Sequence, residues 1–401
     1  MAVRRTRAAL LALLLPALLG SGPVEERARA LHAAALVVDG HNDVPTLMLE
    51  YGFDLGMDGA EAGDRSYWPW FFLPWLPGRP DAERLRTETD LARMRRGGLD
   101  AQFFSIWVAP RYYDPETPGL ATRRALAMLE AVHEQVRRHP EALALAVTAD
   151  DVRRIADGGR LAVLLGLEGG HAIEDDLGTL RRYQALGVRY MTLTWSFSHG
   201  WADSSGGERL HGGLSDFGRE VVRAMNALGM IVDVSHASDE TFWDALEATR
   251  APVIASHSSA RALAPHPRNL TDDMLRAVAA NGGVVMVNFG GIFLDPRKVG
   301  SWRLAKNWIR HAGTLPTTLA MLADHVEHVA RVAGPEHVGL GSDFDGTPFL
   351  PDGMKDVADL PNLTVELARR GWSDADLRKL LGANVLRVMG EVERAAEATG
   401  P

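Results

Sequence analysis

Short apolar or β-branched runs alternate with longer amphipathic stretches from residue 36 onward, and this alternation restricts the fold more than any other feature. Eight of the runs have the length and composition of buried strands, at residues 36–39, 101–108, 161–167, 190–193, 231–234, 253–255, 284–288 and 338–341. Helical patterns lie between them, for example at residues 177–186, 216–228, 240–248, 272–280 and 317–332. Eight strands that alternate with helices predict an α/β fold, a TIM-type (β/α)8 barrel with insertions.

A doubly wound open sheet is the alternative architecture for this pattern. The first strand of such a sheet is normally followed by a glycine-rich loop that binds phosphate groups. Here the first predicted strand runs straight into Gly40, His41, Asn42 and Asp43. The lack of a phosphate-binding loop at this position favours the closed barrel.

Two stretches, 51–84 and 293–316, are interpreted as insertions between barrel units. They contain several prolines and the tryptophans Trp68, Trp70, Trp75, Trp302 and Trp308. Beside the barrel mouth such loops form substrate walls or pack as ordinary covers, and the sequence leaves both open. The stretch 373–398 reads as a C-terminal helix.

Residues of the types that bind metals come just past the end of one predicted strand after another. They are His41 and Asp43 after the first strand, Glu168 after the third, His236 after the fifth, His257 after the sixth and Asp343 after the eighth. Because the carboxyl ends of all strands in a parallel barrel meet at one face, we expect these side chains in one pocket. A lone histidine after a strand is more often structural, but six such positions together predict a metal site.

The residue types also indicate how many ions are held. In an extended segment His41 and Asp43 point to the same side, so they can bind one ion together. Glu168 can bridge two cations, and His236 with His257 would complete the second site. Two Zn²⁺ ions suit imidazole and carboxylate ligands, with Mn²⁺ or Co²⁺ as substitutes in vitro. Such a pair holds a hydroxide and polarises a carbonyl, so the expected reaction class is metal-assisted hydrolysis.

Composition narrows the remaining chemistry. A formal net charge of -9 without a basic stripe excludes nucleic acid as a partner. The chain has no cysteine, which excludes disulfides, a cysteine nucleophile and a lipid anchor on cysteine. The remaining histidines in or beside helical stretches are interpreted as surface or packing residues, namely His133, His139, His325, His328 and His337.

The first 22 residues have the layout of a secretory signal. Arg4, Arg5 and Arg7 precede the apolar run 8–19, which is followed by small residues. The run is shorter than the roughly 20 residues that a membrane span needs, so we expect export with cleavage, leaving residues 23–401 as a single domain. The protein is then periplasmic or extracellular. A retained N-terminal anchor is one alternative, and membrane contact is expected only in that case. A misassigned start, with 24–35 as the first helix, would leave the protein cytoplasmic.

Six segments resemble the membrane dipeptidase (renal dipeptidase) family of zinc peptidases, along nearly the full length after the signal. They are VVDGHNDVP at 37–45, GLEGGHAIEDDLGTL at 166–180, GMIVDVSHAS at 229–238, PVIASHSSAR at 252–261, PRNLTDDML at 267–275 and HVGLGSDFDG at 337–346. The resemblance implies a TIM barrel, a binuclear zinc site and hydrolysis of dipeptides, often with tolerance of D-residues at the second position. It assigns His41 and Asp43 to the first zinc and His236 and His257 to the second, with Glu168 bridging.

Two further residues take their roles from the resemblance. Arg268 matches the family's arginine for the substrate carboxylate, and Asp343 matches the acid near the substrate amine and the reaction centre. A planar guanidinium can form two parallel hydrogen bonds to a carboxylate, and a fixed acid can hold an ammonium group. A site that binds both termini favours dipeptides over longer chains.

The segment LTWSFSHGWAD departs from the family pattern. Mammalian members carry a histidine directly after the threonine, where it is thought to help bind the intermediate, whereas Trp195 stands here. Tryptophan offers one N–H donor and cannot exchange protons at neutral pH, so it could orient an oxyanion but not act as an acid or base. His199, four residues further on, is a candidate to reach the same space.

The expected mechanism is attack by a zinc-bridging hydroxide on the peptide carbonyl, with Glu168 and the ions setting the nucleophile and Asp343 delivering the proton to the leaving amine. Two other functions remain open. One is a binuclear-zinc hydrolase of lactones or other small amides and esters, and the other is a binding protein without turnover. A homodimer is also left open.

Overall fold

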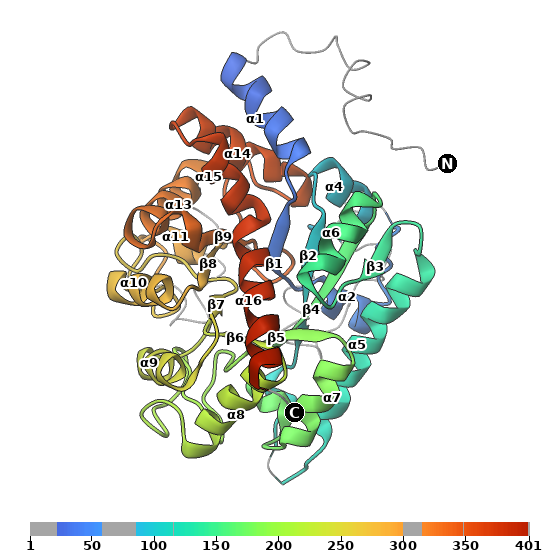
Figure 1. The fold of residues 1–401 in the computed structure, drawn as a ribbon, viewed down its shortest axis with the longest axis vertical. Helices are drawn as coiled ribbons and strands as arrows, with labels where there is room; N and C mark the ends of the chain where they lie inside the picture. The colour runs from blue at the N-terminus through green and yellow to red at the C-terminus, as the bar shows by residue number, and fades with distance from the viewer. Residues whose placement is uncertain (1–21, 58–85, 115, 300–314, 348, 400–401) are drawn as a thin grey trace.

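The computed structural model describes residues 22–57, 86–114, 116–299, 315–347 and 349–399. Eight parallel strands in it close into a barrel (Figure 1), because the edge strand β2 pairs with β4. In order around the ring they are β2 (Ala101–Trp107), β1 (Val38–Asn42), β9 (Val338–Gly341), β8 (Val284–Asn288), β7 (Ile254–Ala255), β6 (Ile231–Asp233), β5 (Val188–Thr192) and β4 (Leu161–Glu168). The predicted barrel and its eight strands are confirmed, and the open doubly wound sheet is excluded.

One short strand was not predicted. It is β3 (Leu143–Leu145), which pairs with the first half of β4, while β5 pairs with the second half of the same strand. Residues 1–21, which hold most of the predicted signal, lie outside the described residues. So do 58–85 and 300–314, with the five tryptophans of the predicted insertions.

Helices surround the barrel (Figure 1). They are α1 (Pro23–Ala34), α2 (Val44–Tyr51), α4 (Leu91–Arg96), α5 (Leu120–Arg138), α6 (Ala149–Asp157), α7 (Leu177–Ala185), α8 (Asp216–Ala227), α9 (Asp239–Ala248), α10 (Asp272–Ala280), α11 (Gly291–Leu294), α13 (Leu319–Ala333), α14 (Leu360–Arg369), α15 (Asp374–Arg378) and α16 (Asn384–Thr399). The helical stretches predicted between strands correspond to α7, α8, α9, α10 and α13. The predicted C-terminal helix is divided into α15 and α16 by a π-helical turn over Lys379–Ala383.

Hydroxyl side chains define where several of these helices begin. Ser215 precedes α8, Ser238 precedes α9 and Thr271 precedes α10, and each accepts a hydrogen bond from a backbone N–H of the first turn. These bonds satisfy donors that a helix start otherwise leaves without a partner. The caps thus fix the point at which the chain turns from the barrel mouth into each helix.

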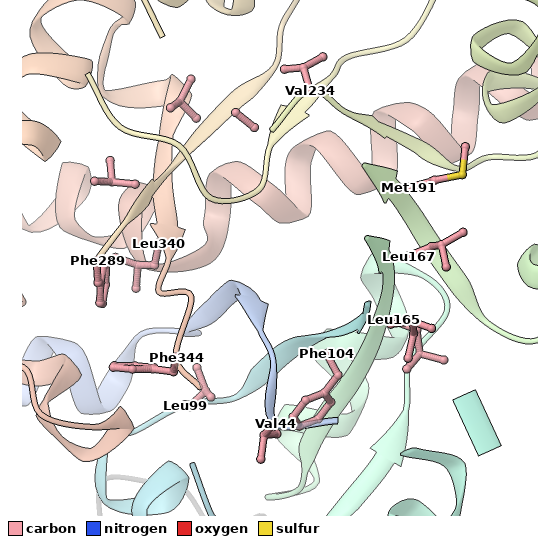
Figure 2. Packing of buried hydrophobic residues seen from close by; sticks show 14 of the residues in the cluster. Val44, Leu99, Phe104, Leu165, Leu167, Met191, Val234, Phe289, Leu340 and Phe344 are labelled. Carbon is pink, nitrogen blue, oxygen red and sulfur yellow. The ribbon is translucent and has the colours of Figure 1, made fainter. Parts of the chain in front are cut away.

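Alternation along β4 directs its last side chain inward. Leu165 and Leu167 lie on one side of the strand, in the apolar layer under the helices (Figure 2). Leu164 belongs to the second apolar cluster, inside the barrel, and Glu168 has the same parity as Leu164. Gly166, also on that parity, has no room for a side chain because the Tyr190 ring occupies the space. Glu168 therefore projects into the barrel mouth.

The last helix closes the opposite end. Val385, Val388 and Met389 of α16 pack in one apolar cluster with the first residues of several strands, including Val38 of β1 and Val284 of β8. Figure 1 shows α16, in red, crossing the middle of the molecule over the strands. Because the amino ends of the strands are covered in this way, the carboxyl ends remain for a functional site.

The first described helix is part of the fold. Ala28 and Leu31 of α1 are buried in the main apolar cluster. His32 is buried as well, and its ring nitrogens lie 2.7 Å from the Thr364 hydroxyl and 2.8 Å from the Gly97 carbonyl. Within the described residues, no helix has the length and apolar character that a membrane crossing requires.

Candidate metal centre

The five predicted metal ligands come together at the carboxyl ends of the strands. His41 lies near the end of β1, and Asp43 is the residue that precedes α2. Glu168 is the last residue of β4, while His236 and His257 lie in the segments just after β6 and β7. All five residues are buried.

The Glu168 carboxylate stands between two pairs of side chains. Its Oε2 lies 3.4 Å from Nε2 of His41, which in turn is 3.5 Å from Oδ2 of Asp43. Its Oε1 lies 3.1 Å from Nε2 of His236 and 3.6 Å from Nε2 of His257. One oxygen thus faces the first predicted pair and the other faces the second, as a carboxylate that bridges two cations must.

The first pair meets in a different way from the expected one. Asp43 has φ -98° and ψ 8°, which is not an extended conformation, and the register of β1 on β2 shifts between Asp39 and Asn42. The expectation that an extended segment aligns His41 and Asp43 is therefore wrong in its geometry. The turn into α2 brings the two side chains together instead.

Three residues at the mouth have a left-handed backbone. His236 has φ 66°, and Asp343 and Asp345, which follow β9, both have φ 61°. This conformation is uncommon for residues other than glycine, and it is concentrated at functional sites where the surroundings impose it. Gly346 beside them cannot carry a side chain, because its Cβ would collide with the carboxylates of Asp43 and Asp343. The backbone here is shaped to place acids closely together.

The charge balance of the cluster fits cations. Nε2 of His41 and Oδ1 of Asp43 are buried and have no hydrogen-bond partner among the described residues. Burial and the neighbouring Glu168 raise the pKa of Asp43. Burial also raises the pKa of Asp343 to about 8, with the negative charges of Asp43 and Glu168 adding to the effect. Bound cations would satisfy these atoms and offset the repulsion among the acids.

The second pair is held in the form that binds metal. Burial, together with the positive charge of Arg268, lowers the pKa of His236 to about 3. Burial, with the charges of His41 and Arg268, lowers the pKa of His257 well below its ordinary value. Both imidazoles are therefore neutral at neutral pH, which is the state that donates a lone pair to a cation.

Arg268 lies beside the second pair. Its guanidinium donates to the Ser258 hydroxyl at 3.3 Å and to the His257 carbonyl at 3.2 Å, and it sits 5.5 Å from the centre of the Phe293 ring. Its Nε is buried and lacks a hydrogen-bond partner in the described part of the chain. Burial lowers the pKa of Arg268 to about 10, so the group stays charged and has a donor to offer.

Two polar residues that sequence reasoning missed hold the acids in place. The Ser105 hydroxyl donates to Oε2 of Glu168 at 3.0 Å, and the Asn288 amide donates to Oδ2 of Asp343 at 2.8 Å. Ser105 lies in β2 and Asn288 ends β8. A polar residue near the carboxyl end of an otherwise apolar strand was the signal that could have found both.

Trp195 and His199, the two candidates from the segment LTWSFSHGWAD, lie in different surroundings. The Trp195 ring lies 6.0 Å from the His236 ring and meets Trp107 edge-on at 5.2 Å, so it borders the cluster. His199 instead shares a hydrogen bond of 3.0 Å between its Nε2 and the Leu193 carbonyl, and its ring packs against Trp201. Among the described contacts, none connects His199 to the five predicted ligands.

The histidines interpreted as packing or surface residues make contacts of that kind. His325 is buried and lies 3.1 Å from the Leu294 carbonyl, and His328 lies 2.7 Å from the Asp272 carboxylate. His139 is partly exposed and lies 2.6 Å from Asp54. These contacts link helices and loops to one another and do not involve the cluster.

Comparison with known proteins gives relatives over nearly the whole chain. A family model described as membrane dipeptidase, peptidase family M19, matches residues 25–400. An uncharacterized dipeptidase of Schizosaccharomyces pombe is 36% identical over an alignment of 385 residues, and the match covers 93% of this chain and 84% of the relative. The probable dipeptidase PvdM from Pseudomonas aeruginosa is 27% identical, with a TM-score of 0.77 and coverage of 93% of this chain and 99% of that one.

A second solved structure is similar. It is a metallo peptidase from Rhodobacter sphaeroides liganded with a phosphinate mimic of the dipeptide L-Ala-D-Ala. It is 27% identical to this chain, with a TM-score of 0.70, and the match covers 89% of this chain and 99% of that one.

Proposed function

Because the chain belongs to the membrane dipeptidase family of metallo-dipeptidases, peptidase family M19, we propose that it hydrolyses dipeptides with two Zn²⁺ ions bound at the barrel mouth. The single observation that carries this proposal is the position of Glu168, whose two oxygens face different pairs of ligand side chains. Asp43 and His41 would hold one ion, and His236 and His257 the other.

Two Zn²⁺ ions bound there would supply a water nucleophile at neutral pH and polarise the peptide carbonyl. The protein's own side chains hold and orient the groups that bind the ions and the substrate. Ser105 keeps the Glu168 carboxylate turned toward both pairs, and Asn288 orients Asp343. Asp343, held at the barrel mouth in this way, is the group that would pass a proton to the leaving amine.

Arg268 and Asp343 would define the length of the substrate. The Nε donor of Arg268 is available to a carboxylate, and Asp343 can accept from the ammonium group at the other end. A longer peptide would place an uncharged amide against one of these buried groups, which disfavours its binding. We propose L,D-dipeptides among the substrates, which the phosphinate mimic of L-Ala-D-Ala on the Rhodobacter sphaeroides relative supports.

The test is zinc analysis of the purified protein together with hydrolysis assays on L,L- and L,D-dipeptides and on lactones. We expect two zinc ions per chain and dipeptides as the preferred substrates. The variant His236→Ala should lose zinc and activity. His139→Ala, a histidine paired with Asp54, is the matched control and should keep both. Dipeptide hydrolysis retained by His236→Ala, or a clear preference for lactones, would refute the proposal.

We also propose that residues 1–22 are a cleaved secretory signal and that residues 23–401 form the exported enzyme. The start of α1 at Pro23 and the packing of that helix in the core support this boundary. The mass and N-terminal sequence of the protein recovered from the periplasm or medium test it. Recovery of the uncleaved chain in membranes would indicate a retained anchor, and recovery in the cytoplasm would indicate a misassigned start.

A further inference from the structure

Two buried hydroxyl groups contact the far side of two ligand histidines. Oη of Tyr190 lies 2.8 Å from Nδ1 of His41, and Oγ of Ser256 lies 2.7 Å from Nδ1 of His257. Both hydroxyl residues are completely buried. A neutral imidazole carries its proton on one nitrogen only, so the role of each hydroxyl in these contacts decides which nitrogen keeps a lone pair.

The proton of the Ser256 hydroxyl is already committed. Oγ of Ser256 donates to Oδ2 of Asp233 at 2.6 Å, and an ionised carboxylate can only accept. The hydroxyl has one proton, so toward His257 its oxygen acts as the acceptor. Nδ1 of His257 must then carry the ring proton, and Nε2, which faces Glu168, keeps its lone pair.

Asp233 is fixed firmly enough to impose this arrangement. Besides the Ser256 hydroxyl, it accepts from the Thr192 hydroxyl at 2.6 Å and from the backbone N–H groups of Ser235 at 3.0 Å and Ser256 at 2.9 Å. Four donors surround the carboxylate, which satisfies the hydrogen-bonding capacity of its buried oxygens. These four hydrogen bonds fix the orientation of the Asp233 carboxylate, so the Ser256 hydroxyl keeps donating to it.

Tyr190 repeats the arrangement for His41. Its Oη donates to the Gly40 carbonyl at 3.2 Å, and a carbonyl can only accept, so Oη accepts from Nδ1 of His41. The ring is held by Phe103, whose centroid lies 5.0 Å away, and by the space left at Gly166. In the neutral imidazole that a bound cation requires, Nε2 of His41 is thereby left with its lone pair toward Glu168 and Asp43.

We propose that Ser256, backed by Asp233, and Tyr190 are positioning residues that fix the tautomers of His257 and His41, so that each Nε2 faces the cations as a ready ligand. The inference rests on the proposed zinc site. Each proposed ion has one histidine or more, and one histidine per ion is held in this way. Among the described residues, the third histidine, His236, has only the half-buried Ser196 hydroxyl near its Nδ1, at 3.3 Å, which is a looser contact.

The first experiment measures the zinc affinity of zinc-free protein by competition with a chelator. Ser256→Ala and Tyr190→Phe each remove one hydroxyl, and each should weaken zinc binding by about 10- to 100-fold, the usual effect of removing a partner behind a metal ligand. Thr192→Val is the matched control, because it removes a hydroxyl from the same Asp233 oxygen without touching a histidine. It should change the affinity by less than about 3-fold.

Thermal unfolding of all three variants establishes that they are folded. Wild-type affinity in both Ser256→Ala and Tyr190→Phe would overturn the proposal. So would an equal loss in Thr192→Val, because the effect would then come from general loosening of the barrel. Rescue provides a further check: Ser256→Thr keeps a hydroxyl, so it should bind zinc more tightly than Ser256→Ala.

A second measurement uses the wild-type chain and needs no zinc. Nitrogen NMR of ¹⁵N-histidine-labelled, zinc-free protein reports which ring nitrogen of His257 is protonated, and a His257→Gln variant assigns the signal. We expect the proton on Nδ1, and a proton on Nε2 would overturn the proposal. The result also separates the two proposals. A protein that has the Nδ1 tautomer of His257 but binds no zinc would contradict the proposed function, whereas the proposed hydrogen bonds from His257 to Ser256 and from Ser256 to Asp233 would still hold.

Discussion

The rings of His41 and His257 stack with their centroids 3.8 Å apart. One residue comes from β1 and the other from the segment after β7. The proposed function places them on different ions. Contact between these rings, with Glu168 beside both, makes the two halves of the centre a single packed unit. A change at one half should therefore affect the other.

Replacement of the shared ligand tests this coupling. Glu168→Gln keeps the shape of the side chain but removes the negative charge that faces both pairs. We expect loss of zinc from both positions and a decrease in kcat/KM of more than about 100-fold, since even partners behind the ligands contribute 10- to 100-fold. Zinc content by atomic absorption and dipeptide hydrolysis measure the two effects.

Glu174→Gln is the control for this experiment. Glu174 lies on the same segment, but its carboxylate accepts from the backbone at the start of α5. Two zinc ions and near-native activity are expected there. If Glu168→Gln kept one tightly bound zinc ion with unchanged affinity, the two halves would be independent and the bridging role would be wrong.

Removal of Arg268 should abolish discrimination between a free and a blocked C-terminus. In the wild-type enzyme a C-terminally amidated dipeptide should be a poorer substrate than the free acid, by about 10- to 100-fold in kcat/KM, the value of a charge-assisted hydrogen bond. In Arg268→Met both substrates should react at similar low rates. A comparison within one variant excludes general misfolding, which would slow both equally, and preserved discrimination in Arg268→Met would show that another group binds the carboxylate.

We expect Trp195 to contribute to the activity of the wild-type enzyme. Its ring packs edge-on against Trp107 and borders His236, and a histidine would fill this space less well. We expect Trp195→His to be no faster than the wild type in kcat, and Trp195→Phe, which keeps the ring but lacks the N–H, to reveal what the donor contributes. A large gain in turnover for Trp195→His would instead indicate a protein that has lost catalysis.

The stability of the loop beside Trp195 should depend on the negative charge of Asp203. Burial alone raises the pKa of Asp203, but the backbone N–H groups of Leu210, Gly213, His211 and Gly212 outweigh it, and the net shift is downward. A pKa lower in the folded state means that the stabilisation is present above the unfolded value, near pH 4, and is lost as the pH falls through the folded one. Asp203→Asn should lower the free energy of unfolding at neutral pH by about 1–3 kcal/mol.

The measurement is denaturant unfolding of wild type and Asp203→Asn between neutral and strongly acidic pH. The difference between the two proteins should shrink below about pH 4, because the wild-type carboxylate then becomes protonated. A difference that stays constant over this range would mean that the charge of Asp203 does not stabilise the loop.

The strands of the barrel could be predicted because they are largely buried and most of them consist mainly of apolar residues. The strand β4 is eight residues long and β2 is seven, and both stand out clearly. The three residues of β3 do not, because a strand so short is defined by its pairing with β4 and not by its own pattern. The break between α15 and α16 could not be predicted either, because the residues of the π-helical turn, Lys379–Ala383, also fit the pattern of an ordinary α-helix.

The ligands could be predicted because barrel geometry alone brings strand ends together. Contacts that depend on side-chain direction could not. The turn at Asp43, the inward Ser105 and the bond from His199 to Leu193 each depend on local backbone angles that residue types do not reveal. The relay from Asp233 through Ser256 to His257 likewise requires the register of neighbouring strands.

Because α16 covers the amino end of the barrel, the ring of strands acquires its complete interior only after α16 has been synthesised. Val38 and Val284 stay exposed to water until that segment arrives. A nascent chain therefore remains incompletely folded until α16 has left the ribosome, and a truncation that removes α16 should yield a product that proteases remove.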